Sequence, residues 1–256
     1  MTHPRRMDPW RLEWLRMTRS ARGLALALVY LFFGFTGPLM ARYLPEIAKL
    51  ASSGIQIVVP APRPADGIVN YVNQTSQTGL LVVIVVTAGA LSFDARRGLS
   101  IFYRTRAPGA FALLWPRFVV ASVSAALAYL LGTAAAWLET RLVLGGLPTG
   151  RLLFGTLGEI VFLAFTVATV AAAATFTRST LGTVGTTAVV LLLILPLAGA
   201  VPPARPWLPG TLMRAPGALV DGAPISDYLG PLAVCVLATA ALLALAVHRA
   251  RDREVA

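Results

Sequence analysis

Long apolar runs recur six times along the chain, separated by polar or proline-rich segments. The runs are 23–40, 75–93, 118–138, 152–176, 181–201 and 228–247. As helices, these runs are long enough to cross a hydrocarbon core of about 30 Å. Their apolar residues do not alternate strictly with polar ones, as they would in a membrane β-strand, so the pattern predicts helices. The expected fold class is therefore an all-α integral membrane protein with six transmembrane helices.

Composition supports a membrane-embedded chain. Of the 256 residues, 57% are hydrophobic and 13% are charged, whereas soluble domains carry about 25% charged residues. The mean hydropathy is +0.73. We expect a single transmembrane domain over 1–256, in which 1–22 form a cytoplasmic interfacial helix, 23–247 the six-helix membrane region and 248–256 a cytoplasmic tail.

The segment before the first run predicts an amphipathic helix. Asp8 and Pro9 are typical of an N-cap and a first helical position. Trp10, Trp14 and Met17 then fall on one helical face, while arginines occupy much of the remainder. Such a helix is suited to the headgroup layer, where its cations contact anionic membrane lipids. The alternative is a basic flank that only fixes topology.

The charge pattern predicts orientation. The net charge is +11, and the cations are 21 arginines and Lys49, a bias typical of high-GC coding. They lie between apolar runs and not on one soluble face, so we expect no nucleic-acid partner. One set of alternate connections, which includes both termini, carries 15 of the 22 cations. The positive-inside rule therefore predicts cytoplasmic termini.

Two outer loops are longer than a simple connection requires. The first, 44–74, predicts a short helix around 45–52, an extended segment, and a polar approach to the second span. The second, 202–227, is rich in proline but keeps apolar residues, namely Leu208, Leu212, Met213, Leu219 and Val220. A segment with that many apolar residues is expected to fold back onto the membrane.

Catalytic machinery is not evident in the sequence. The only lysine, Lys49, does not follow a glycine-rich loop, so the chain has no Walker-type ATPase motif. The two histidines, His3 and His248, lie at opposite ends and form no zinc-protease or triad spacing. The single cysteine, Cys235, lies in the last apolar run and is expected to be a packing residue. We expect no enzyme activity and no catalytic, cofactor or metal site in this chain.

Glu159 is the only acidic residue well inside an apolar run. A central carboxylate costs about 3 kcal/mol on insertion scales, so such a residue usually faces a cavity or finds a partner. Glu159 is therefore a candidate pathway residue; alternatively, it is hydrated or paired near the outer interface. The nearby glycines have the small-residue spacing typical of close helix packing. These are Gly155, Gly158, Gly182 and Gly185.

The stretch 77–118 resembles the second span and following cytoplasmic loop of ABC-2 type ABC transporter permeases. The positions that carry the resemblance are Gln77, Gly79, Leu80, Leu81, Asp94, Gly98, Pro108 and Phe118. Arg117 stands where the family usually has lysine. Leu99 replaces a threonine, and the sequence FYRTR replaces an acidic, leucine-rich turn, so contact with a partner is expected to differ in detail.

The resemblance implies a bacterial permease of the inner (plasma) membrane that belongs to an ATP-driven exporter, and we expect an actinobacterial source. It implies pairing with a second permease copy or paralogue and docking of separate ABC ATPase subunits, which bind ATP and Mg. The expected coupling segment combines bulky apolar side chains with arginines, as interface anchors do. Its residues are Ser100, Ile101, Phe102, Tyr103, Arg104 and Arg106. The alternative for this segment is a basic loop that only sets topology.

Two other functions stay open at this point. One is a secondary transporter or channel that uses Glu159, although such proteins normally show more intramembrane charge or repeated broken helices. The other is a noncatalytic membrane scaffold. An adjacent gene for an ATPase with the motif GxxxxGK followed by Ser or Thr would favour the exporter. The sequence does not specify the substrate.

Overall fold

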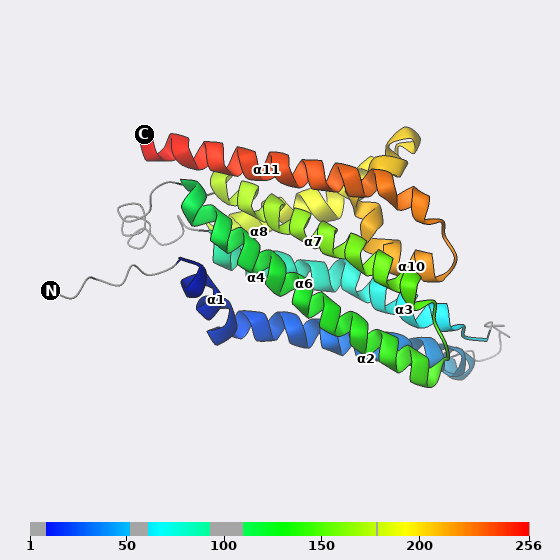
Figure 1. Ribbon diagram of the computed structural model, residues 1–256. Coiled ribbons are helices and arrows are strands. Elements are labelled where there is room, and N and C mark those ends of the chain that lie inside the picture. Colours follow the sequence, from blue (N-terminus) through cyan, green and yellow to red (C-terminus); the bar gives the residue numbers. More distant parts are fainter. Residues whose placement is uncertain (1–8, 52–60, 93–109, 178, 256) are drawn as a thin grey trace.

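The computed structural model describes residues 9–51, 61–92, 110–177 and 179–255 as a bundle of long helices (Figure 1). No strand occurs in these ranges. Six helices in the described part are long and apolar enough to cross a membrane. They cover Ala21–Ile47, Pro64–Leu91, Leu114–Val143, Thr149–Phe176, Thr180–Ala198 and Ile225–Arg251. The expectation of an all-α integral membrane protein with six spans is confirmed.

The helices follow one another as a string of antiparallel passes (Figure 1). Their bounds are α1 Pro9–Arg19, α2 Ala21–Ala51, α3 Pro64–Gln74, α4 Leu80–Leu91, α6 Ala110–Val143, α7 Thr149–Phe176, α8 Thr180–Ala188, α9 Leu195–Ala198, α10 Ala215–Val220 and α11 Leu229–Val255. Single π-helical stretches join α3 to α4 and α8 to α9, so each of these pairs crosses as one span. Helix α1 and the last turns of α11 lie at one end of the bundle, which we call the α1 end (Figure 1). Helix α10 lies near the opposite end, which we call the α10 end.

The buried core is centred on α7. This helix is the most buried of the six spans, and it packs against α4, α6, α8, α10 and α11. The span formed by α8 and α9 and the span of α11 are the least buried. These two spans therefore leave broad apolar surfaces for lipid or for another membrane protein.

Glycines allow α2 and α6 to approach closely. A Cβ atom on Gly34 would lie 2.5 Å from the carbonyl oxygen of Gly132, and a Cβ on Gly132 would lie 2.5 Å from that of Tyr30. Carbonyl oxygens cannot move away without displacing a helix. The α2–α6 contact thus depends on small residues, as is common in membrane helix packing.

The described parts of the segment 44–74 differ from the sequence expectation. The helix expected around 45–52 is not separate, because α2 continues through Pro45 to Ala51. The second span begins at Pro64, eleven residues before the apolar run that starts at Thr75. Its first part, α3, buries Ile68, Tyr71 and other residues along one face. The polar approach is therefore helical, because one buried face suffices to hold α3 against the bundle. The segment expected to be extended lies largely outside the described residues.

The proline-rich segment 202–227 packs onto the bundle, whereas the sequence analysis expected it to fold back onto the membrane. It forms 3₁₀ turns at Pro202–Trp207 and Pro209–Arg214, then α10, then a 3₁₀ turn at Ile225–Tyr228. Helix α10 contacts α3 and α7. The apolar residues kept in this loop explain the fold-back, since Leu212 and Leu219 are fully buried.

Candidate functional site

Polar side chains meet inside the bundle around Glu159. This residue lies ten positions after the start of α7, about 15 Å along the helix, and it is only 4% exposed. Buried tyrosines from three other helices, Tyr30 of α2, Tyr71 of α3 and Tyr129 of α6, lie within electrostatic reach of its carboxyl group. We call these four residues the tyrosine–glutamate cluster.

The three tyrosines join their helices at one level of the bundle. The rings of Tyr30 and Tyr129 meet edge to face with centroids 5.5 Å apart, and those of Tyr71 and Tyr129 stack at 6.0 Å. The Tyr71 hydroxyl lies 3.3 Å from the Tyr129 carbonyl oxygen, to which it donates, and 3.3 Å from the Thr133 hydroxyl. These contacts couple α2, α3 and α6 mechanically.

The cluster contains hydrogen-bonding capacity that its neighbours do not use. Within the part of the chain that the structure describes, neither Glu159 Oε2 nor the Tyr129 hydroxyl has a hydrogen-bond partner. A buried carboxylate oxygen without a partner is costly. The cost is removed when the group binds a proton, a cation or a hydroxyl donor. The cluster therefore has the chemistry of a small polar binding site inside an apolar bundle.

Helix α11 also packs against α7 and contributes the buried residue Cys235. Its side chain is fully buried, and Sγ lies 3.7 Å from the carbonyl oxygen of Val161. The thiol packs as a small side chain between α7 and α11, as the sequence predicts. Among the described residues, no group of three or more His, Cys, Asp or Glu side chains could hold a metal ion.

An ion pair fastens α1 to the bundle at the α1 end. Arg117 Nε of α6 lies 2.9 Å from Glu13 Oε1, and the two side chains are only 6% and 12% exposed. The same Glu13 oxygen is 2.9 Å from Arg16, whose side chain reaches solvent. We call the Glu13–Arg117 contact the α1 clasp. Because both of its side chains are largely shielded, loss of one partner would leave the other charge uncompensated in a poorly hydrated site.

The face predicted for the interfacial helix is divided in the structure. Helix α1 covers Pro9–Arg19, and the predicted N-cap, Asp8, lies outside the described residues. Met17 is buried against the bundle, while Trp10 and Trp14 are each 43% exposed. Met17 therefore anchors the helix to the protein and leaves the two tryptophans at the surface, where membrane-interface aromatics are commonly found.

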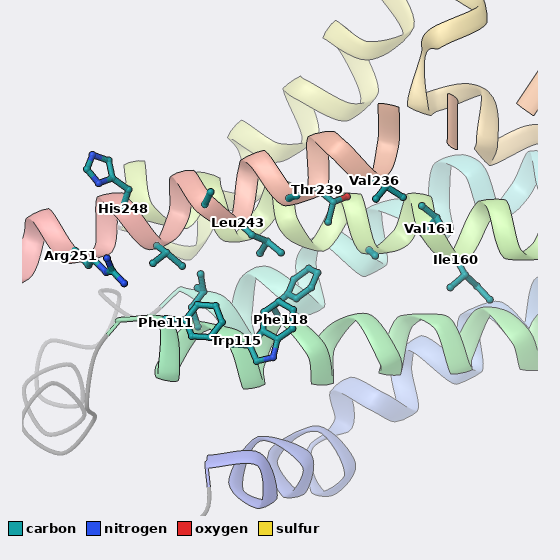
Figure 2. Close-up of a pocket in the computed structure, with 15 residues that line it drawn as sticks. Phe111, Trp115, Phe118, Ile160, Val161, Val236, Thr239, Leu243, His248 and Arg251 are labelled. Carbon is teal, nitrogen blue, oxygen red and sulfur yellow. The ribbon is translucent and has the colours of Figure 1, made fainter. Parts of the chain in front are cut away.

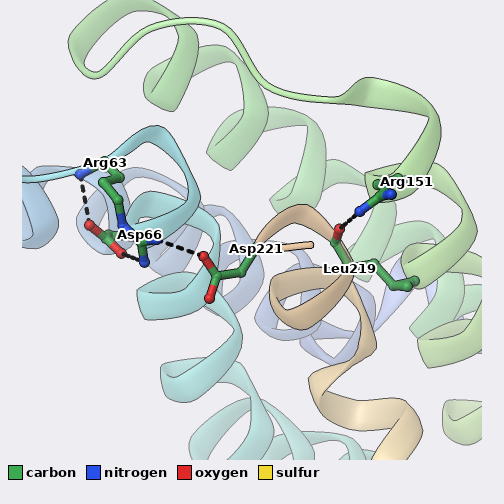
Figure 3. Close-up of polar contacts among 5 residues, drawn as sticks. All are labelled: Arg63, Asp66, Arg151, Leu219 and Asp221. Carbon is green, nitrogen blue, oxygen red and sulfur yellow. Dashed lines mark hydrogen bonds and ion pairs between the residues drawn. The ribbon is translucent and has the colours of Figure 1, made fainter. Parts of the chain in front are cut away.

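Polar contacts at the α10 end hold the proline-rich segment 202–227 in place (Figure 3). Arg63, just before α3, lies 3.2 Å from Asp66 and 3.0 Å from Asp221 at the end of α10. The hydrogen bond to Asp66, followed by the charge of Asp221, raises the pKa of Arg63 above its usual value. Arg151 of α7 donates to the Leu219 carbonyl oxygen at 3.4 Å. Helix α10 is thus tied to both α3 and α7.

The predicted packing glycines have three different environments. A Cβ on Gly155 would lie 2.5 Å from Pro216 Cα, and one on Gly158 would touch Leu212 at 3.4 Å, so both support close packing of α7 on the segment 202–227. Gly182 lies beside Ser179, whose side chain caps α8. No atom lies within 4 Å of a Cβ on Gly185. Gly185 therefore takes no part in helix packing within the described part of this chain, because that side of α8 faces away from the bundle.

The predicted coupling residues all lie outside the described part of the chain. They are Ser100, Ile101, Phe102, Tyr103, Arg104 and Arg106. The segment that contains them leads directly into α6, and Arg117 of the α1 clasp follows about two helical turns after the start of that helix. The coupling role of these residues stays a prediction.

The sequence analysis missed two features of the site, although each has a signal. Tyr30 and Tyr129 lie in the middle of apolar runs, whereas membrane tyrosines are usually found near the interfaces. Glu13 is the only acidic residue in an otherwise basic helical segment. A central tyrosine and a lone acid of this kind each indicate a specific partner.

The helices and their apolar surfaces define a multi-pass integral membrane protein. No family model matches the chain. It is 23% identical over 134 residues to the uncharacterized transmembrane protein YxlG of Bacillus subtilis (strain 168). The match covers 51% of this chain and 52% of that protein, so it spans about half the length of each. This likeness supports a membrane protein.

Proposed function

We propose that this chain is the membrane-spanning permease subunit of an ATP-driven exporter, with ATP hydrolysis in a separate partner. The observation that carries the proposal is the α1 clasp. Arg117 belongs to the stretch 77–118 that resembles ABC-2 permeases, and it is the residue that grips α1. A push on the loop before α6 would therefore reach α1 as well as α6.

The packing of the helices could transmit a movement of that loop to the interior of the bundle. Helix α6 packs tightly on α2 through Gly34 and Gly132. Tyr129 of α6 also contacts Tyr30 and Tyr71. A tilt of α6 would thus displace the tyrosine–glutamate cluster. In the proposed mechanism, this displacement alternately opens the cluster toward each side of the membrane, and the barely buried α8–α9 or α11 surface receives a second permease.

The proposal is tested at the coupling segment. The double variant Phe102→Ala and Arg104→Glu is expected to weaken ATPase binding by about thirtyfold or more, because truncation of an interface anchor commonly costs about 2 kcal/mol. Copurification with an ATPase encoded beside the chain measures this loss. Arg42→Glu, an exposed cation of α2 toward the α10 end, is the matched control and should retain the ATPase. Wild-type copurification of the double variant would remove the coupling role from this segment.

The role of Glu159 is tested separately. Glu159→Gln keeps the shape of the side chain but removes its charge, so assembly should be retained. If the carboxyl binds substrate, transport should fall by about tenfold or more, since a charged hydrogen bond contributes about 1.5–3 kcal/mol. Glu46→Gln, an exposed change on α2, is the control. Transport equal to wild type across the pH range would exclude Glu159 from the pathway.

One observation favours a second candidate, a secondary transporter that uses Glu159. The unpaired buried Oε2 atom is the kind of group that carries coupling protons or cations in such proteins. This candidate predicts transport driven by an ion gradient without ATP, and loss of that coupling in Glu159→Gln. The exporter hypothesis predicts that transport requires ATP both in the wild-type protein and in Glu159→Gln. Transport in vesicles with and without ATP separates the two.

A further inference from the structure

An apolar groove runs along the periphery of the bundle between α6 and α11 (Figure 2). Its volume is about 800 Å³, and Ile160, Val161 and Ala164 of α7 contribute to its lining. The groove is separate from the tyrosine–glutamate cluster, since neither Glu159 nor any of the three tyrosines lines it. A volume of this size is sufficient for a ligand larger than a single side chain.

One wall of the groove is aromatic. Phe111, Trp115 and Phe118 follow one another along α6, with ring centroids 5.6 Å and 5.7 Å apart. Phe111 is 51% exposed although it is large and apolar. These rings begin within the first turn of α6, at the α1 end, where tryptophan typically marks the membrane–water interface.

The opposite wall of the groove shows how long the groove is relative to the thickness of a membrane leaflet. It extends along α11 from Val236 to Arg251, a separation of about 22 Å at 1.5 Å per residue. One leaflet contributes about half of a hydrocarbon core of about 30 Å. The groove therefore reaches from the interface through the depth of one leaflet, which is the space that a lipid acyl chain occupies.

A cation, Arg251, lines the groove at its α1 end. Figure 2 shows Arg251 extending from α11 into the space toward α6, above Phe111. The rest of the lining is almost wholly apolar, apart from Thr239 and His248. We propose that the groove binds an anionic phospholipid, with one acyl chain along the aromatic wall and the phosphate at Arg251. Charge and length select this occupant, because a lipid has its anion at the interface and its apolar chain below.

A neighbouring arginine provides a matched control. Arg249 lies two residues before Arg251 on α11, but its guanidinium lies over the Phe176 ring at 4.7 Å and does not line the groove. The two residues carry the same charge at nearly the same membrane depth. A general attraction of lipid to the basic end of α11 would depend on both arginines, whereas the groove depends on Arg251.

The lipid is tested by quenching of Trp115 in vesicles. A protein that keeps Trp115, with the other four tryptophans changed to Phe, is reconstituted with brominated phosphatidylglycerol or brominated phosphatidylcholine. Phosphatidylglycerol should associate about fivefold more strongly, as expected for one arginine at the surface. Arg251→Gln should remove this preference, and Arg249→Gln should retain it. Ala240→Phe, which fills the groove, should reduce quenching by both lipids.

Several results would overturn the proposal. They are equal quenching by the two lipids, equal loss of preference in both arginine variants, or unchanged quenching in Ala240→Phe. Disulfide cross-linking of two copies through Ala240→Cys, in a Cys235→Ala background, would instead assign the groove to a second chain. Native mass spectrometry of the protein with all its tryptophans supplies an independent readout. It should show the same fivefold preference, lost in Arg251→Gln; absence of a preference in wild type would also contradict the proposal.

Discussion

Arg117→Gln is expected to release α1 from the bundle. The substitution breaks the α1 clasp, whose two charges are largely shielded from water. Removal of one partner of a buried pair costs about 3–5 kcal/mol. We expect the low end, about 3 kcal/mol, because Arg16 still contacts Glu13. Hydrogen exchange of the α1 amides should then become about a hundredfold faster.

A double-mutant cycle assigns this effect to the pair. Glu13→Gln, Arg117→Gln and the combined variant should be strongly non-additive, because either single change already removes the contact. Arg19→Gln, an exposed cation on the same helix, should leave α1 protected. Equal loss of protection in Arg19→Gln, or additive effects of the two clasp variants, would contradict a specific ion pair.

Gly132→Ala is expected to separate α2 from α6. The added Cβ would lie 2.5 Å from the Tyr30 carbonyl oxygen and 2.8 Å from the Tyr71 hydroxyl. Overpacking of this kind lowers the free energy of unfolding by about 3 kcal/mol. Unfolding in detergent, followed by circular dichroism, measures the loss. The tyrosine–glutamate cluster should be disturbed in the same variant, because two of its members surround the glycine.

Gly185→Ala is the control for this prediction. A Cβ at that position meets no atom within 4 Å, so the free energy of unfolding should change by less than about 0.5 kcal/mol. If Gly132→Ala and Gly185→Ala unfolded alike, loss of glycine itself would explain the result. The close α2–α6 contact would then not be limiting for stability.

Hydrophobic pattern alone was sufficient to predict the six spans, because each must be apolar over most of a bilayer thickness. It failed for the start of the second span. The segment 64–74 carries Asp66, Asn70 and Asn73, which lower its mean hydropathy, yet Ile68 and Tyr71 bury one face of α3. A helix that is shielded by its neighbours on one side needs only that side to be apolar.

The site was predictable to a smaller extent. A carboxyl group in an apolar run identified Glu159, because its desolvation cost is independent of the fold. The tyrosines around it come from α2, α3 and α6, and only tertiary packing brings them together. The α1 clasp likewise joins positions 13 and 117, which no local spacing relates. Local chemistry could therefore be predicted, whereas pairing between distant helices could not.

The most direct test of the proposed function is purification of the wild-type chain from its own membranes. The exporter predicts that an ATPase with a GxxxxGK motif copurifies in a fixed ratio to this chain, and that the complex hydrolyses ATP. Loss of both in the Phe102→Ala and Arg104→Glu variant would assign the contact to the coupling segment. A folded chain that purifies without such an ATPase, and that moves ions along a gradient in vesicles lacking ATP, would contradict the account.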